Sequence, residues 1–312
     1  MIPSFAFLFP GQGSQAVGMG KCLYENDLQA RALFEHADAT LGRFLSRMCF
    51  EGPEDLLKET ENTQPALYVC SAAAVEVLRG CGVEPSCVAG HSLGEYSALY
   101  AAGVVDFETG LRLVAARGKA MAEASRNSPG AMAAVIGLGI AKLDEVCVVA
   151  SNGTGPVVVA NDNCPGQVVI SGTRQSVERA CDLARAEGAR SAIPLPVSGA
   201  FHSPLVHDAR EVMEEELANA VFRKPRCPFV SNVTAEPVQD PEEIRWNLIE
   251  QITSRVRWVE SVRGIAAMGL TAGLEVGPGK VLAGLVRRIS PEMAVHAAGT
   301  MESISRVLSA ED

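Results

Sequence analysis

The pentapeptide Gly90-His91-Ser92-Leu93-Gly94 restricts the fold more than any other feature of this sequence. It follows the apolar run Cys87-Val88-Ala89 and opens a helical pattern from Glu95 to Ala102. Glycines on both sides of a serine suit a tight turn from a strand into a helix, because side chains there would clash. Such an elbow exposes the serine hydroxyl and lets the Leu93 N–H donate to a developing oxyanion. Ser92 is therefore a candidate nucleophile; the alternative is a turn that only lets a helix pack closely on the sheet.

The rest of the chain alternates short apolar runs with longer helical patterns, which is typical of α/β proteins with a largely parallel sheet. Candidate strands are Phe5–Phe9, Cys87–Gly90 and Gly273–Val276, each followed by a glycine-containing turn and a helical pattern. Ligand chemistry in such sheets gathers at the carboxyl ends of the strands. We expect a large α/β-hydrolase-like domain built on this parallel sheet.

A different order of elements is expected between Ser128 and Val197. The pattern predicts strand Ala131–Ile136, helix Ala141–Ala150, strand Val157–Ala160, strand Gln167–Ser171, helix Arg174–Glu187 and strand Ser191–Leu195. The order βαββαβ is that of a ferredoxin-like unit, which can form a compact domain by itself. We therefore predict a large catalytic domain from residues 1–127 and 198–312, with a ferredoxin-like small domain, residues 128–197, inserted into it.

Composition argues against several classes of protein. The 312 residues carry a formal net charge of −10, which disfavours nucleic-acid binding. No apolar stretch is long enough to span a bilayer, and the short apolar N-terminus is predicted as a strand rather than a signal peptide. Nine cysteines without a C-x-x-C pair, and five histidines that do not cluster with them, favour buried thiols in a reducing compartment over disulfides or a metal site. We expect a soluble cytoplasmic protein without a metal.

A nucleophilic serine needs a base, and His202 is the best placed of the five histidines. It lies in Gly199-Ala200-Phe201-His202-Ser203-Pro204, where the predicted small domain returns the chain to the large one. A loop at a domain junction is well placed to face a cleft. His207 is the competing candidate, and a purely structural histidine is the alternative to both. His91 is expected to point away from its neighbour Ser92.

Two other segments each allow two interpretations. Gly11-Gln12-Gly13-Ser14-Gln15-Ala16 fits G-x-G-x-x-A, but no clear second strand ends in an acidic residue about 20 positions later, as ribose recognition requires. Gln12 can instead present a donor to an oxygen atom. Arg117 falls at the edge of the apolar stripe of a predicted helix, Phe107–Ala124. Its guanidinium either binds an anion bidentately or reaches water while its stem covers the apolar edge.

Seven segments carry a resemblance to one known family. They are Phe9-Pro10-Gly11-Gln12-Gly13-Ser14-Gln15, Thr63-Gln64-Pro65-Ala66, Gly90-His91-Ser92-Leu93-Gly94-Glu95, Arg117-Gly118, Asn161 with Pro165-Gly166-Gln167, Phe201-His202-Ser203, and Glu275-Val276-Gly277-Pro278-Gly279. In this order, over nearly the whole chain, they resemble the malonyl-CoA:acyl-carrier-protein transacylases. Two positions depart from the family pattern: Arg255 stands where proline is usual, and Asp162 where an aromatic or amide residue is more common.

The resemblance implies roles for nine residues. It makes Ser92 the nucleophile, His202 the base, Gln12 and the Leu93 N–H the oxyanion hole, Arg117 the partner of the malonate carboxylate, Gln251 the residue whose main-chain carbonyl orients the histidine, and Gln64, Asn161 and Phe201 substrate-pocket residues. No cofactor and no metal are implied. Phe201 resembles the residue of malonyl-selective members.

The resemblance also implies the reaction. A malonyl group passes from malonyl-CoA to Ser92 and then, in ping-pong order, to the phosphopantetheine thiol of acyl carrier protein, which supplies fatty-acid elongation. Two alternatives remain open at this point: a trans-acting acyltransferase of a polyketide synthase, and a serine esterase or thioesterase, which needs an acidic residue between Ser92 and His202 aimed at the histidine. A monomer is expected.

Overall fold

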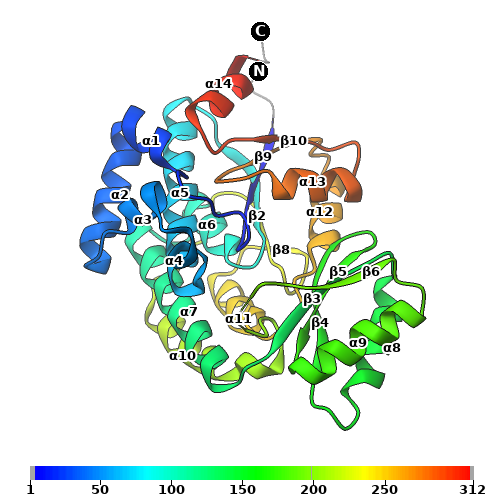
Figure 1. The fold of residues 1–312 in the computed structure, drawn as a ribbon. Helices are drawn as coiled ribbons and strands as arrows, with labels where there is room; N and C mark the ends of the chain where they lie inside the picture. The colour runs from blue at the N-terminus through cyan, green and yellow to red at the C-terminus, as the bar shows by residue number, and fades with distance from the viewer. Residues whose placement is uncertain (1–3, 198, 310–312) are drawn as a thin grey trace.

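The computed structural model describes residues 4–197 and 199–309, so the predicted domain limits at 1, 198 and 312 lie outside the described residues. The protein has a mixed α/β architecture with one mainly parallel and one antiparallel sheet (Figure 1). The larger sheet has six strands in the order β10-β9-β1-β2-β7-β8. Their bounds are β1 Phe5–Phe9, β2 Pro85–Gly90, β7 Phe229–Val230, β8 Pro237–Val238, β9 Ala272–Glu275 and β10 Ala294–Ala297. All neighbours are parallel except β7 and β8.

Strand β1 lies at the centre of this sheet because it is apolar on both faces. Its five residues, Phe-Ala-Phe-Leu-Phe, are all buried, as expected of a parallel strand covered by helices on both sides. Phe7 and Phe9 join one core cluster with residues of α5 and α7, while Ala6 and Leu8 join another with Trp258 and residues of α12 and α13. Figure 1 shows these two groups of helices on opposite sides of the sheet.

The helices around this sheet are short except for α5 and α7, which have 21 residues each. Their bounds are α1 Lys21–Asn26, α2 Leu28–Leu41, α3 Leu45–Glu51, α4 Glu54–Lys58, α5 Thr60–Gly80, α6 Gly94–Ala101, α7 Phe107–Asn127, the 3₁₀ turn η1 Pro204–Val206, α10 His207–Asn219, α11 Pro241–Gln251, α12 Trp258–Ala267, α13 Val281–Ile289 and α14 Met301–Ser309. Helices α5 and α7 pack closely because α7 has glycine at the contact. A Cβ atom on Gly118 would lie 2.9 Å from the carbonyl oxygen of Thr60.

The antiparallel sheet comprises β3 Ala131–Ile136, β4 Val157–Cys164, β5 Gln167–Gly172 and β6 Ser191–Pro194, in the order β4-β5-β3-β6. Helices α8 (Ile140–Ser151) and α9 (Arg174–Ala186) pack on it and share a separate apolar core with its strands. The six predicted elements of this region are present in the predicted order, and most of their ends agree within one residue.

One predicted strand was too short. The expected strand ended at Ala160, whereas β4 continues to Cys164. Asn161, Asp162 and Asn163, which follow the predicted end, have low strand propensity. Two contacts hold them in the sheet: the ladder to β5, which contains bulges, and a bridge from Asn161 to Val256. Tertiary pairing therefore overrides the local preference, and it joins the small sheet to a loop of the larger part.

Within the described residues, no helix has both the length and the apolar composition needed to cross a membrane. All nine cysteines have free thiols, and six of these residues are buried.

Candidate active site

Ser92 lies in a strained turn between β2 and α6. Its φ of 52° is in the left-handed region, which a residue with a side chain adopts only when the surroundings hold it there. The glycines on either side leave no room for a side chain. A Cβ on Gly90 would lie 1.8 Å from the carbonyl carbon of Gly94, and a Cβ on Gly94 would lie 2.1 Å from the carbonyl oxygen of Phe9. The elbow predicted from the pentapeptide is therefore present, with the sheet directly against it.

His202 is the histidine that the fold brings to Ser92. The Ser92 Oγ lies 2.8 Å from Nε2 of His202. On the other side of the ring, Nδ1 lies 2.9 Å from the carbonyl oxygen of Gln251 and 3.1 Å from that of Ser254. Because carbonyl oxygens only accept, Nδ1 carries the proton and Nε2 is left to accept the serine hydroxyl. His207 lies elsewhere: its side chain is exposed, 3.7 Å from Glu211.

Burial keeps His202 neutral. The residue is only 4% exposed, and desolvation together with the positive charge of Arg117 lowers its pKa to about 3. The two carbonyl acceptors oppose this shift, but less strongly. At neutral pH the imidazole is therefore an unprotonated base with its lone pair directed at Ser92 Oγ.

Arg117 is buried beside the same serine. It is 1% exposed and donates from Nη1 to Gln64 Oε1 at 2.8 Å, and from Nη2 to Gln251 Oε1 at 2.8 Å and to Ser92 Oγ at 3.1 Å. Its guanidinium carbon lies 5.8 Å from the ring centre of Tyr96, and burial lowers its pKa. Such burial rules out a head group that reaches water. Within residues 4–197 and 199–309, all of its hydrogen-bond acceptors are neutral and Nε has none.

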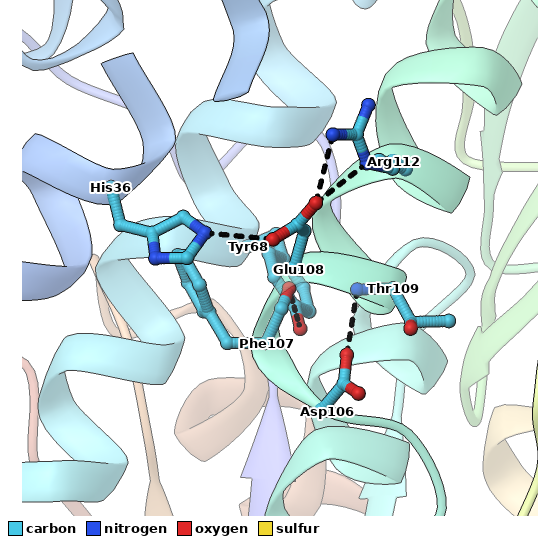
Figure 2. A network of polar contacts seen from close by, with 7 residues as sticks. All are labelled: His36, Tyr68, Asp106, Phe107, Glu108, Thr109 and Arg112. Carbon is cyan, nitrogen blue, oxygen red and sulfur yellow. Dashed lines mark hydrogen bonds and ion pairs between the residues drawn. The ribbon is translucent and has the colours of Figure 1, made fainter. Parts of the chain in front are cut away.

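Arg117 is carried by α7, whose N-terminal end is anchored to neighbouring helices (Figure 2). Asp106 caps the helix by accepting from Thr109 N at 2.9 Å. Tyr68 of α5 donates to the carbonyl oxygen of Phe107 at 3.1 Å, within the core. At the surface, Glu108 accepts from Arg112 and faces His36 of α2 at 3.1 Å; water screens such exposed pairs, so they contribute little to stability. These contacts fix the N-terminal end of α7, which precedes Arg117 in the chain.

Gln251 connects the components of the site. Besides its carbonyl bond to His202 and its bond to Arg117, its side-chain Nε2 donates to the carbonyl oxygen of Ser92 at 2.9 Å and to Glu95 Oε2. Burial raises the pKa of Glu95 to about 8, against the opposing effects of the Asn232 N–H, the Gln251 amide and the charge of Arg117. One glutamine thus contacts Ser92, His202 and the guanidinium of Arg117.

Asn232 is a site residue that sequence reasoning missed. Its Oδ1 accepts from Ser92 N at 2.7 Å, its Nδ2 donates to Gly90 O at 2.7 Å, and its own N–H donates to Glu95 Oε1 at 2.6 Å. The side chain thus holds the elbow from both ends. The only signal in the sequence is a polar Ser-Asn pair after the apolar Phe229–Val230, a two-residue strand too short to predict.

A cavity of about 120 Å³ collects eight of the nine predicted residues. Its lining includes Gln12, Gln64, Ser92, Leu93, Arg117, Asn161, Phe201 and His202. Gln251 lies behind this lining. A larger cavity of about 370 Å³ shares Gln12 and Phe201 with the first, and both basic and acidic residues, among them Arg126 and Glu59, line its wall. The large parallel-sheet part and the small sheet both contribute walls, so the cavity lies between them.

The remaining predicted positions are explained by local contacts. Gln12 Oε1 accepts from Thr60 Oγ1 at 2.9 Å, so its amide nitrogen is available as a donor. Leu93 stands immediately before α6, where backbone N–H groups have no partner within the helix. His91 also lines the cavity, but its Nε2 contacts Asn163 Oδ1, at 2.8 Å, rather than Ser92. Within the described part of the chain, no cluster of three or more metal-ligating side chains is found.

Comparison with known proteins gives one family. Residues 6–304 match the acyl transferase domain family. The malonyl CoA-acyl carrier protein transacylase of Bacillus subtilis is 46% identical over 299 residues, covering 96% of this chain and 94% of that protein. The acyl-carrier-protein-S-malonyltransferase of Bartonella henselae superposes with a TM-score of 0.95 at 43% identity, covering 98% of this chain and 99% of the other.

A third match has a partner bound. It is the structure of a type II PKS acyl-carrier protein in complex with its malonyl-transacylase, with a TM-score of 0.95, 41% identity, and coverage of 98% of this chain and 99% of the other. The family match, the identities and the shared fold extend over nearly all of the sequence. The chain therefore belongs to the acyl transferase domain family, as one of its malonyl CoA-acyl carrier protein transacylases.

Proposed function

We propose that this enzyme transfers a malonyl group from malonyl-CoA to the phosphopantetheine thiol of acyl carrier protein through a malonyl ester on Ser92. The observation that carries the proposal is the buried guanidinium of Arg117 in the cavity that holds Ser92 and His202. Among the described residues, Arg117 donates only to neutral acceptors, and such a buried cation favours a ligand that brings a carboxylate. The relatives include malonyl CoA-acyl carrier protein transacylases and a malonyl-transacylase in complex with an acyl-carrier protein, which agrees with this chemistry.

In the first half-reaction, His202 Nε2 accepts the proton of Ser92 Oγ as the oxygen attacks the thioester carbonyl carbon. The tetrahedral intermediate collapses, the C–S bond breaks, and the CoA sulfur takes the proton from His202. In the second half-reaction the pantetheine thiol gives its proton to His202 and attacks the ester. Ser92 leaves with that proton, and the enzyme is regenerated without any redox change. The scheme needs no cofactor and no metal.

The oxyanion of each intermediate is stabilised by the N–H of Leu93 and the side-chain amide of Gln12. Both residues line the cavity next to Ser92, and Thr60 orients the Gln12 amide by donating to its oxygen. Donors that are already oriented stabilise developing charge strongly, because they need not reorganise during the reaction.

Malonate binding also tunes the base. The charge of Arg117 contributes to the low pKa of His202 in the empty site. A substrate carboxylate paired with Arg117 compensates that charge, so the pKa of His202 rises toward the range in which a general base is most effective. Gln64 and Asn161 complete the pocket around the malonyl group. The bulk of Phe201 disfavours a methyl branch, and the larger cavity beside it accommodates the pantetheine arm.

We infer the finer architecture from the order of elements. The antiparallel unit β3-α8-β4-β5-α9-β6, with sheet order β4-β5-β3-β6, supports a ferredoxin-like small domain at residues 128–197. The parallel sheet with its serine elbow supports an α/β-hydrolase-like large domain from residues 1–127 and 198–312. A cytoplasmic monomer is part of the same proposal.

An esterase or thioesterase is a weaker alternative. It would orient His202 with an acidic side chain, whereas the acceptors at Nδ1 are the carbonyls of Gln251 and Ser254. A trans-acting acyltransferase of a polyketide synthase is the closer alternative, since one related structure has a type II PKS acyl-carrier protein bound. The fatty-acid and polyketide functions use the same site and differ in the carrier protein that accepts the malonyl group.

Covalent labelling tests the nucleophile. Incubation with malonyl-CoA alone should add one malonyl group, located at Ser92 by peptide mapping. Ser92→Ala should lose the adduct and at least about 10³-fold in transfer rate, because no other group replaces the attacking oxygen. An adduct on any of the nine cysteines would overturn the assignment.

The pH dependence tests the base. Since burial lowers the pKa of His202 to about 3, the acid limb of kcat/KM, which reports the free enzyme, should lie well below pH 6.5. In Arg117→Ala the limb should move to higher pH, because the charge that lowers this pKa is gone. His202→Ala should lose most of the activity, with His207→Ala as the matched control that retains it. A wild-type acid limb at pH 6.5 or above would contradict a buried neutral base.

Substrate selectivity tests Arg117. Malonyl-CoA and acetyl-CoA differ by one carboxylate, so Arg117→Ala should reduce malonyl transfer on the order of 100-fold while sparing acetyl transfer. Arg117→Lys should rescue malonyl transfer only in part, because a point charge cannot form two parallel hydrogen bonds. Arg112→Ala, on the exposed side of the same helix, is the control. An unchanged ratio of the two kcat/KM values in Arg117→Ala would mean that malonate is recognised elsewhere.

A further inference from the structure

The loop 251–256 both orients His202 and touches the small sheet. Its carbonyl oxygens at Gln251 and Ser254 accept from His202 Nδ1. Two residues after Ser254, Val256 N donates to Ala160 O at 2.8 Å, and Val256 O accepts from Asp162 N at 3.0 Å. The position of the histidine thus depends on a loop whose far end is bonded to β4.

Arg255 lies between the carbonyl that orients the histidine and the bridge to β4. Its Nη2 pairs with Asp144 of α8, and its Nε donates to Val159 O at 3.4 Å. The ion pair is partly shielded, with 31% of the Arg255 side chain and 45% of the Asp144 side chain exposed. Asp162 is also close: burial raises its pKa, and the charge of Arg255 opposes that shift.

The residue type matters at this position. Proline, which the family resemblance led us to expect there, has neither a charge nor a donor. It could not replace either contact of Arg255. The chain therefore combines its two departures from the family pattern, Arg255 and Asp162, in one charged cluster beside the loop.

We propose that Arg255 is a positioning residue for the transfer reaction: by tying the loop to α8 and β4, it keeps the Ser254 carbonyl on Nδ1 of His202. Arg255 is absent from the lining of the cavity, so it acts through the loop. Without it, the loop keeps its backbone bonds to the small sheet at Val256, but the Ser254 carbonyl, the second acceptor of the imidazole, shifts. The inference rests on the proposed function, in which His202 is the base.

The matched control is Arg288 of α13. Its Nη1 donates to Gln167 Oε1 and its Nη2 to Pro165 O, both at 2.8 Å, so it ties the same two parts of the protein together without touching the histidine loop. Arg255→Ala and Asp144→Ala should each lower kcat for malonyl-enzyme formation about 3- to 10-fold, with KM for malonyl-CoA changed by less than about 2-fold. The double variant should be no slower than either single variant. Arg288→Ala should retain the wild-type kcat.

A second measurement reads the histidine directly. The pKa of His202, followed by NMR of the labelled imidazole, should fall in Arg255→Ala, because the Ser254 carbonyl that raises it is displaced, and should stay at its wild-type value in Arg288→Ala. The other charged or titratable groups that face the ring, Arg117 and His91, are unchanged in both variants. This measurement needs no turnover, so it remains valid if the proposed reaction fails. An unaltered His202 pKa in Arg255→Ala, or an equal loss of kcat in Arg288→Ala, would overturn the proposal.

Discussion

A positive charge buried next to the nucleophile is the constraint around which this site is organised. Removing a guanidinium from water costs several kcal/mol, and the amide oxygens of Gln64 and Gln251 and the ring of Tyr96 offset only part of that cost. The same guanidinium donates a hydrogen bond from Nη2 to Ser92 Oγ, and its charge lowers the pKa of His202. A substrate that brings its own carboxylate therefore relieves the buried charge and restores the basicity of the histidine. In the proposed mechanism, both selectivity and catalysis depend on this single charge.

The fold makes this placement possible by close approach. Gly118 lets α7 lie against the start of α5, which brings Arg117 within 2.8 Å of Gln64. At the elbow, Gly90 and Gly94 again permit close backbone contacts. Asn232, which follows β7, accepts from Ser92 N and holds that residue in its left-handed conformation. Arg117 of α7, Asn232 after β7 and Gln251 of α11 thus all bond to one residue, Ser92. Few substitutions in these contacts can be neutral, because each side chain has several partners.

The sequence predicted what is encoded locally. Glycine placement and apolar periodicity predicted the elbow, the central strand β1, and the four strands and two helices between β3 and β6. It could not decide between the two interpretations of Arg117, because a helical stripe shows which edge a residue occupies and not what faces that edge. Asn232 escaped notice for a related reason: it is 140 positions from Ser92 and follows a strand of only two residues. Strand β4 ran past its predicted end because a distant loop pairs with it.

The central claim is that the acyl group on Ser92 is passed to a thiol rather than to water. A single-turnover chase tests it most directly: malonyl-enzyme is isolated, mixed with phosphopantetheinylated acyl carrier protein or with buffer, and followed by intact mass. We expect the malonyl group to leave the enzyme and appear on the carrier far faster than it is lost in buffer. Release of free malonate at the same rate with and without the carrier would contradict the claim and identify the protein as a hydrolase.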